Sequence, residues 1–357
     1  MAMVQEIDEQ KRDQFAERVV GDISATVVTA MSVIGDRLGL FKELATSGPV
    51  TSDELAERTG LNERYMREWL SSLACAGYLE YEPDAGRFAL PSEHAPSLAE
   101  EPGPYFAGGF LEVLPYWWGQ TDSIVDAFKS GGGVHQSAYS DHMWSGLERF
   151  TASWFENLLL QVWIPAMPEV QAKLERGVLM ADVGCGNGRA AIKLAKAYPK
   201  SRFVGYDIFG PAIESAVENA RLAGVDDRVK FQQLDASQGL PETFDVIATW
   251  DVVHDMANPR GALRAIREAL NPEGNYILLD INCSDKLEEN FGPLGAMFYG
   301  TSVMYCMTTS LAEQGEALGT VGLPPATVRD LCAEAGFSAV NQLPLENPFN
   351  ILYEIKP

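Results

Sequence analysis

Histidine is scarce in this sequence, and its cysteines are scattered. The 357 residues include four histidines and five cysteines, and no two cysteines form a CxxC pair. Zinc sites usually need clustered cysteine and histidine ligands, so we expect no metal site. An odd, dispersed set of cysteines is typical of reduced thiols in the cytosol, which excludes a disulfide framework.

Positive charge is also in short supply. Lys and Arg number 27 against 50 Asp and Glu, which gives a net charge of −23. A surface this acidic repels nucleic-acid phosphates and anionic lipid headgroups. We therefore expect neither a nucleic-acid partner nor a membrane partner.

Long apolar runs are missing as well. The first 20 residues contain no apolar segment of the kind that a signal peptide needs. No apolar run approaches the roughly 18 residues that cross a bilayer. We expect a soluble, cytoplasmic protein. With 46% hydrophobic residues, the chain is long enough for two domains with buried cores.

The first hundred residues follow a winged-helix pattern. Apolar residues recur at helical spacing over residues 14–34. Thr51 and Glu54 form a capping box at the start of one helix, and Asn62 caps the next. Residues 78–90 alternate around a Pro-Asp-Ala-Gly turn, which predicts a β-hairpin. Two helices followed by a hairpin are typical of a winged helix.

The charges of this domain argue against DNA binding. Residues 1–100 hold 9 Lys and Arg against 18 Asp and Glu. In the second helix of the pair, Arg64 and Arg67 are accompanied by Glu63 and Glu68. DNA-reading domains present positive charge to the phosphates. We expect this domain to dimerise the protein and to cover a ligand pocket instead.

Residues 101–174 are rich in aromatic side chains and contain the glycine-rich stretch KSGGGVHQSAYS. This composition predicts a helical linker that lines a pocket, with core packing as the alternative for most of its aromatics. A second apolar stretch, rich in methionine, follows the fifth predicted strand. Together the two stretches supply the candidate substrate contacts Trp118, His142, Met297, Phe298, Met304 and Tyr305.

From residue 178 onward, apolar strands alternate with amphipathic helices. The predicted strands are residues 178–184, 202–208, 229–235, 244–253 and 275–281. Continuous apolar strands separated by helices predict a parallel sheet that is covered on both faces. The end of the chain adds one helix and two more strands.

The first of these strands runs into the turn DVGCGNG, which contains Gly184, Gly186 and Gly188. No GxxxxGK[ST] phosphate loop is present, and Arg189 occupies the position of the third glycine of a dinucleotide-binding turn. Asp182 precedes the turn and would lie close to the ligand. A carboxylate there disfavours a pyrophosphate and suits a cationic group such as an ammonium or a sulfonium.

Two more acids end later strands. Asp207 follows Asp182 by 25 residues, where a carboxylate can accept both hydroxyls of a ribose. Asp235 ends the third strand and could accept the exocyclic amine of an adenine. Ligands bind beyond the carboxyl ends of parallel strands, so these three acids are expected to converge on one crevice.

In this order the residues resemble class I S-adenosylmethionine-dependent methyltransferases, from about residue 175 to 357. A winged helix before such a domain is similar to small-molecule O-methyltransferases, and the whole resembles a group of actinobacterial methyltransferases. The resemblance implies an α/β fold, with a Rossmann-like domain built on a seven-stranded, mostly parallel sheet and a mainly α winged-helix domain. It implies S-adenosylmethionine as cofactor and S-adenosylhomocysteine as product. The expected domains are residues 1–100, 101–174 and 175–357.

The resemblance also implies roles for single residues. The three glycines let the backbone approach the methionine part of the cofactor, and the helix that starts near Arg189 faces its carboxylate. Asp207 holds the ribose. The adenine is framed by Ile208, Asp235 and Ala236. We place Trp250 on the cofactor side of the crevice, with core packing as its alternative.

His254 and Asp255 match the His-Asp pair of plant-type O-methyltransferases, in which the histidine acts as base. A neutral imidazole can take a proton from a hydroxyl as the methyl group arrives. Asp255 or another acid could orient the ring. Met256 stands where that family commonly has Trp, and a packing or capping role for His254 is the alternative.

We therefore predict a cytoplasmic homodimer that methylates a small aromatic hydroxyl compound. Two alternatives stay open. The winged helix could belong to a transcriptional regulator that senses a ligand through its methyltransferase domain, or the methyl group could go to nitrogen or carbon.

Overall fold

The computed structural model describes residues 7–357 and divides into two compact units. The N-terminal unit holds the chain up to Pro115 together with His142–Ser153. The sheet unit holds Tyr116–Asp141 together with Trp154–Pro357. Each unit has its own hydrophobic core.

The N-terminal unit contains the predicted winged helix. Thr51 and Glu54 form the capping box of α3, Asn62 caps α4, and β1 pairs with β2 as an antiparallel hairpin. The elements of this unit are α1 (Glu9–Arg37), α2 (Leu40–Ser47), α3 (Ser52–Thr59), α4 (Glu63–Cys75), β1 (Glu80–Glu82), β2 (Arg87–Ala89), α5 (Ala95–Leu98), most of α6 (Gly108–Trp118) and most of α8 (Asp141–Trp154).

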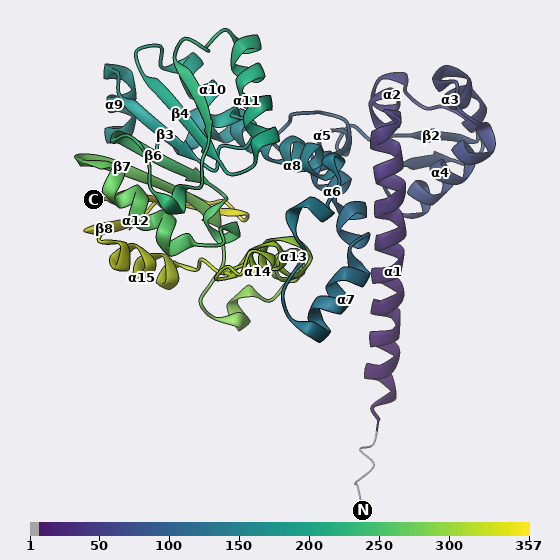
Figure 1. Ribbon diagram of the computed structural model, residues 1–357. Coiled ribbons are helices and arrows are strands. Elements are labelled where there is room, and N and C mark those ends of the chain that lie inside the picture. The colour runs from purple at the N-terminus through teal and green to yellow at the C-terminus, as the bar shows by residue number, and fades with distance from the viewer. Residues whose placement is uncertain (1–6) are drawn as a thin grey trace, which may run out of the picture. The chain divides into compact units, whose positions relative to one another are not determined.

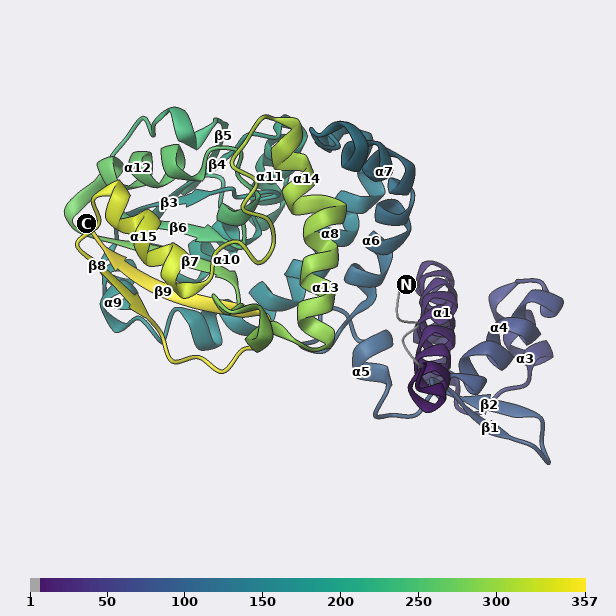
Figure 2. The same cartoon turned by 90° about the horizontal axis from the view of Figure 1, so that it is seen from below.

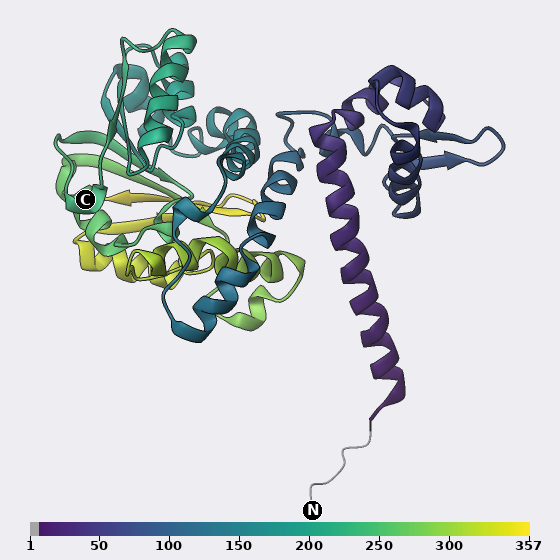
Figure 3. The same ribbon diagram turned by 45° about the vertical axis from the view of Figure 1, so that its right-hand side comes forward.

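Helix α1 corrects one expectation from the sequence. It is a single helix of 29 residues (Figure 3), and by length and composition it is apolar enough to cross a membrane. The expectation that no apolar run approaches that length was therefore wrong, because the hydropathy of this helix stays high over 18 residues although Asp22 interrupts them. One such helix near the N-terminus is weak evidence for a membrane span, since soluble helices pass the same test. Its exposed large apolar side chains are Phe15, Val19, Val20, Ile23, Val27 and Ile34.

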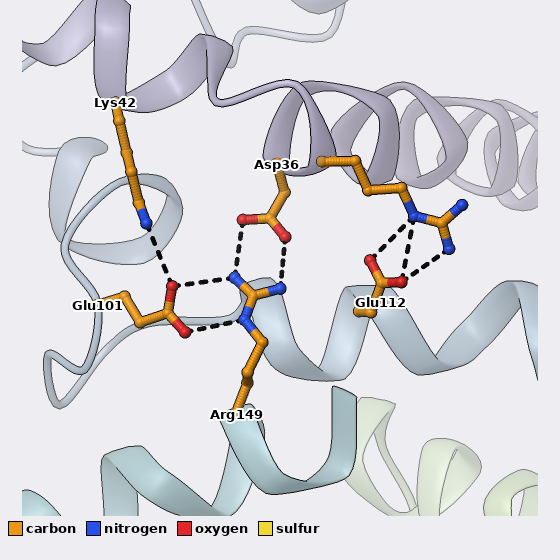
Figure 4. A network of polar contacts seen from close by, with 6 residues as sticks. Asp36, Lys42, Glu101, Glu112 and Arg149 are labelled. Atoms are coloured by element: carbon orange, nitrogen blue, oxygen red, sulfur yellow. Dashed lines mark hydrogen bonds and ion pairs between the residues drawn. The ribbon is translucent and has the colours of Figure 1, made fainter. Parts of the chain in front are cut away.

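A network of ion pairs holds the N-terminal unit together (Figure 4). The guanidinium of Arg149, on α8, donates to both carboxylate oxygens of Asp36 at 2.7 and 3.0 Å and to both of Glu101 at 2.8 and 3.0 Å. Lys42 donates to Glu101 at 3.3 Å. Hydrogen bonds from Arg149 lower the pKa of Glu101 and outweigh its partial burial. One arginine thus joins the end of α1, the loop after α5 and α8.

The sheet unit is built on seven strands in the order β5-β4-β3-β6-β7-β9-β8. The first five in this order are mutually parallel, and β9 pairs antiparallel with both β7 and β8. This confirms the predicted Rossmann-like, mostly parallel sheet. The strands are β3 (Leu179–Val183), β4 (Arg202–Asp207), β5 (Val229–Gln233), β6 (Phe244–Trp250), β7 (Leu270–Ile281), β8 (Ala339–Gln342) and β9 (Asn350–Lys356).

Helices cover both faces of this sheet (Figure 1). One core packs under α9 (Pro168–Arg176), α10 (Arg189–Ala197) and α11 (Gly210–Ala223). The other packs under α12 (Pro259–Ala269) and α15 (Pro325–Ala335). From β3 the chain adds β4 and β5 on one side of the sheet, and it then continues with β6 on the other side of β3. Open sheets of this kind bind ligands where the strand order reverses in this way.

The remaining helices lie around the carboxyl edge of the sheet. Helix α13 (Pro293–Thr301) continues through a π-helical segment (Ser302–Cys306) into α14 (Met307–Ala312), and this run contacts α7 (Thr121–Ser130) (Figure 2). A second π-helical segment spans Phe155–Trp163. Short 3-10 turns span Gln136–Ala138, Ala236–Gln238, Val253–Asp255 and Leu287–Asn290.

Candidate active site

Asp182 lies near the end of β3 with 2% of its surface exposed. Neither of its carboxylate oxygens has a hydrogen-bond partner among the described residues. Burial is the main cause that raises the pKa of Asp182 to about 7; the backbone of Ala191 opposes the shift, and the neighbouring carboxylate of Asp207 adds to it. A buried carboxylate without a partner is costly, and a cationic group placed against it would remove that cost.

The glycine turn after β3 is closely packed at Gly184 and open at Gly186. Gly184 has φ +74°, and a Cβ there would come within 2.6 Å of a methyl group of Val252. Gly186 has φ +50°, and the space where its Cβ would lie is open to 4 Å. Only glycine adopts these backbone angles without strain. A ligand can therefore approach the backbone at Gly186 closely. Gly188 is the N-cap of α10.

Asp207, at the end of β4, supports the same turn. One of its carboxylate oxygens accepts from the backbone N–H of Gly186 at 2.8 Å, and the other accepts from that of Phe209 at 2.9 Å. Burial raises the pKa of Asp207, and these two backbone donors oppose the shift. A carboxylate has about four acceptor positions, so Asp207 retains capacity for ribose hydroxyls.

The three residues expected around the adenine follow β4 and β5 at the same edge of the sheet. Ile208 is 63% exposed, which is unusual for a large apolar side chain beside a buried strand. Asp235 is exposed and caps the 3-10 turn that follows it, accepting from the N–H of Ser237 at 2.9 Å. Ala236 is buried.

Trp250 ends β6 and is buried in an aromatic stack. Its ring lies parallel to that of Trp163, with centroids 5.6 Å apart, and Phe155 meets it edge-on. Its indole N–H has no acceptor within the described part of the chain. Arg189 begins α10 and forms an ion pair with Glu156 at 3.8 Å.

His254 is clamped between two carboxylates. It is 3% exposed, and its Nδ1 lies 2.7 Å from Oδ1 of Asp280, near the end of β7. Its Nε2 lies 3.3 Å from Oδ1 of Asp255. Asp280 also accepts from the N–H of Ile281 at 2.8 Å, which fixes the carboxylate that holds the ring.

The charges around His254 determine its protonation. Burial alone would lower the pKa of His254, but the carboxylates of Asp280 and Asp255 outweigh burial and raise it well above its ordinary value. Asp251, held at φ +59°, is a third acid nearby, and burial raises its pKa to about 7. The two carboxylates therefore favour the protonated form of the His254 ring when no ligand is bound.

Cys306 completes this cluster from the π-helical segment. Its sulfur accepts from the hydroxyl of Thr320 at 3.0 Å. The ligand atoms of His254, Asp255 and Cys306 lie within 4.8 Å of one another, a donor set that Zn²⁺ can use. Both ring nitrogens of His254 already face the carboxylates of Asp280 and Asp255, and we assign no metal.

The candidate substrate residues fall in two places. Most belong to the sheet unit: Trp118, Met297, Phe298, Met304 and Tyr305. Tyr305 is buried, stacks on Trp117 with centroids 6.2 Å apart and meets Tyr139 edge-on. The hydroxyl of Tyr139 donates to the backbone carbonyl of Met304 at 2.6 Å. His142 is exposed and belongs to the N-terminal unit.

Two features of the site were missed in the sequence. Asp280 ends an apolar strand in the same way as Asp182 and Asp207 do, so the repeated pattern of an acid at a strand end could have identified it. Cys306 gave no signal, because its approach to His254 depends on the π-helical turn that widens the helix at that point.

Two families match this chain. The family described as "Methyltransferase domain" matches residues 174–321, and the "Rv2258c-like winged HTH domain" matches residues 26–100. The chain is an S-adenosylmethionine-dependent methyltransferase. The buried, unpaired Asp182 and the open space at Gly186 fit a cofactor that carries positive charge.

Among curated relatives, the methyltransferase is 25% identical over 272 residues to the mitomycin biosynthesis 6-O-methyltransferase of Streptomyces lavendulae, a match that covers 74% of this chain and 77% of that one. It is 36% identical over 110 residues to the 27-O-demethylrifamycin SV methyltransferase of Amycolatopsis mediterranei, covering 30% of this chain and 40% of that one. The chain thus matches less than half of the second relative's length.

Solved structures share the fold. Mitomycin 7-O-methyltransferase has a TM-score of 0.71 at 19% identity, and the match covers 98% of this chain and 100% of that one. Human N-acetylserotonin methyltransferase has a TM-score of 0.68 at 18% identity, covering 100% and 99%. At such low identity these likenesses establish the architecture alone.

Proposed function

We propose that this methyltransferase transfers the methyl group of S-adenosylmethionine to a hydroxyl group of a small aromatic molecule. One observation carries the proposal: two buried groups lie at the same edge of the sheet. They are the carboxylate of Asp182, which has no hydrogen-bond partner among the described residues, and His254 with its hydrogen bond to Asp280. The curated relatives named for mitomycin and rifamycin support oxygen as the acceptor atom.

In this proposal the chain binds the cofactor along the ends of β3, β4 and β5. Asp182 pairs with the positive charge of the methionine part, and the glycine turn lets that part approach the backbone. Asp207 holds the ribose, and the residues after β4 and β5 frame the adenine. Bound S-adenosylmethionine supplies the activated methyl group.

His254 would remove the proton of the acceptor. Its Nδ1–H donates to Asp280, which fixes the tautomer and leaves Nε2 as the atom that accepts a proton. The carboxylates of Asp280 and Asp255 stabilise a proton on Nε2, which must leave before the ring can act as a base. Positive charge on the bound cofactor would lower the pKa of the ring and assist that loss. If His254 only lines the pocket, this proton step belongs to another group.

The variant His254→Ala tests this function. We expect it to lose most of the transfer of radiolabelled methyl to phenolic acceptors while its affinity for S-adenosylhomocysteine changes little, because the ring is assigned to the acceptor side. His94→Ala, in the N-terminal unit, is the matched control. Full transfer by the His254 variant would rule out the base role.

We further propose that the protein is a cytoplasmic homodimer joined through the N-terminal unit, and that its domains are residues 1–100, 101–174 and 175–357. The exposed apolar side chains of α1 support this interface. A nitrogen or carbon acceptor remains an alternative, since His254 could also assist transfer to nitrogen.

Binding to DNA is the weaker proposal. In α4, Arg64 pairs with Glu68 at 2.6 Å and Arg67 pairs with Glu63 at 2.7 Å, so both arginines are neutralised on their own helix. A DNA-binding helix leaves such charges for phosphates. Retention of genomic fragments in a gel-shift assay at low salt would favour the regulator instead.

A further inference from the structure

Asn350 is a buried amide that nothing in the described chain satisfies. It begins β9 and is 2% exposed, and neither its side-chain oxygen nor its side-chain nitrogen has a hydrogen-bond partner among residues 7–357. A buried amide of this kind destabilises the fold, so an unpaired one calls for a reason outside the fold.

The register of the sheet places Asn350 at the ligand-binding edge. Asp182 pairs with Ala248, Trp250 pairs with Leu279, and Ile281 pairs with Asn350. Paired residues, and residues two apart on one strand, point to the same face. One face of the sheet therefore carries Asp182, Trp250 and Asn350. Strand β9 lies three strand spacings, or roughly 14 Å, from β3, where the cofactor is expected to bind.

Each of these three residues has a buried polar group without a partner. The residue between Leu279 and Ile281 is Asp280, which points to the opposite face and holds His254. The end of β7 thus separates the proposed base from Asn350 by a single strand. A molecule that lies across the end of β7, with its hydroxyl at His254, would present another part to Asn350.

Aromatic rings lie around Phe349, the residue before Asn350. The ring of its neighbour Phe349 is 6.3 Å from that of Trp154 and 6.4 Å from that of Phe298. Aromatic rings at the start of β9 suit a planar acceptor, and the amide of Asn350 suits a polar substituent on it.

We propose that Asn350 determines acceptor specificity by hydrogen bonding to a second polar group, a carbonyl or a hydroxyl, of an aromatic acceptor. This rests on the proposed O-methyl transfer. The carboxamide can both donate and accept, so it recognises either substituent and disfavours an acceptor that has neither.

The test compares two probes, 5-hydroxy-1,4-naphthoquinone, which has carbonyls beside its hydroxyl, and 1-naphthol, which has none. We expect the wild-type protein to methylate the quinone with the higher kcat/KM. Asn350→Leu should lower kcat/KM for the quinone about tenfold, which corresponds to about 1.4 kcal/mol, and leave that for 1-naphthol unchanged. Asn350→Ala is a second variant, and Asn341→Leu, at an exposed position of β8, is the control.

Thermal melting separates a role in recognition from a role in folding. Because Leu removes an unsatisfied buried amide, Asn350→Leu should melt at the same temperature as the wild type or higher. An unchanged preference between the probes, or a clearly lower melting temperature, would overturn the assignment. If the wild type methylates neither probe, the proposed function fails for these acceptors, and the melting comparison still decides whether Asn350 is structural.

Discussion

Replacing Asp182 by Asn tests the idea that this carboxylate is kept unpaired for a cationic ligand. Burial raises its pKa from 3.8 to about 7. The folded protein therefore holds this proton more tightly than the unfolded chain, so the stability of the ligand-free protein falls as pH rises from about 4 to about 7. Above that range the ionised carboxylate lowers the free energy of unfolding by about 4 kcal/mol, at about 1.4 kcal/mol per pKa unit.

Asparagine has nearly the same shape and no charge. We expect Asp182→Asn to be more stable than the wild type, with a gain that is about 2 kcal/mol larger at pH 8 than at pH 5.5. The assay is urea unfolding followed by tryptophan fluorescence at both pH values, with the exposed Asp226→Asn as control. Saturating S-adenosylhomocysteine should stabilise the wild type far more than the variant. A gain that does not depend on pH would refute the reasoning.

Three further outcomes follow from the geometry. The carboxylate of Asp280 raises the pKa of His254, and only the deprotonated ring accepts a proton, so kcat/KM should rise with pH. Asp280→Asn should move that rise to lower pH and reduce kcat/KM at its plateau. An unshifted pH profile would contradict the pairing of His254 with Asp280. Arg149→Met leaves the buried carboxylate of Asp36 without its partner and should lower the free energy of unfolding in urea titrations by about 3 kcal/mol. A change below about 0.5 kcal/mol would disprove the stabilising role of this ion pair. Ile23→Asp places charge on the exposed apolar side of α1 and should convert a dimer to a monomer in sedimentation, while an unaltered mass would exclude this interface.

The parts of the fold that depend on local chemistry could be predicted from the sequence. Thr51 and Glu54 cap their helix through neighbouring backbone groups, so four residues suffice to recognise the motif. Asp182 and Asp207 end apolar strands, and the parallel arrangement of those strands brings both acids to one edge without further information.

The parts that depend on distant contacts could not. The strand-end pattern could have identified Asp280 as an acid of the site, but its contact with His254 arises only because β7 lies beside β6. Arg149 reaches Asp36 across more than a hundred residues of chain. The π-helical turn at Cys306 leaves no periodic signal, because its residues are also suited to an ordinary helix. Asn350 precedes a run of apolar residues in β9, and only the register of the sheet relates it to the ligand-binding edge.

Calorimetric titration with S-adenosylhomocysteine tests the central claim most directly, because it measures binding at the ends of β3 and β4 without requiring the acceptor. The wild type and the exposed control Asp226→Ala should bind one equivalent per chain with equal affinity. Asp207→Ala should bind at least tenfold more weakly, because the ribose loses its acceptor and the glycine turn loses its hydrogen bond from Gly186. Equal affinity of all three proteins would contradict the cofactor site described for this methyltransferase.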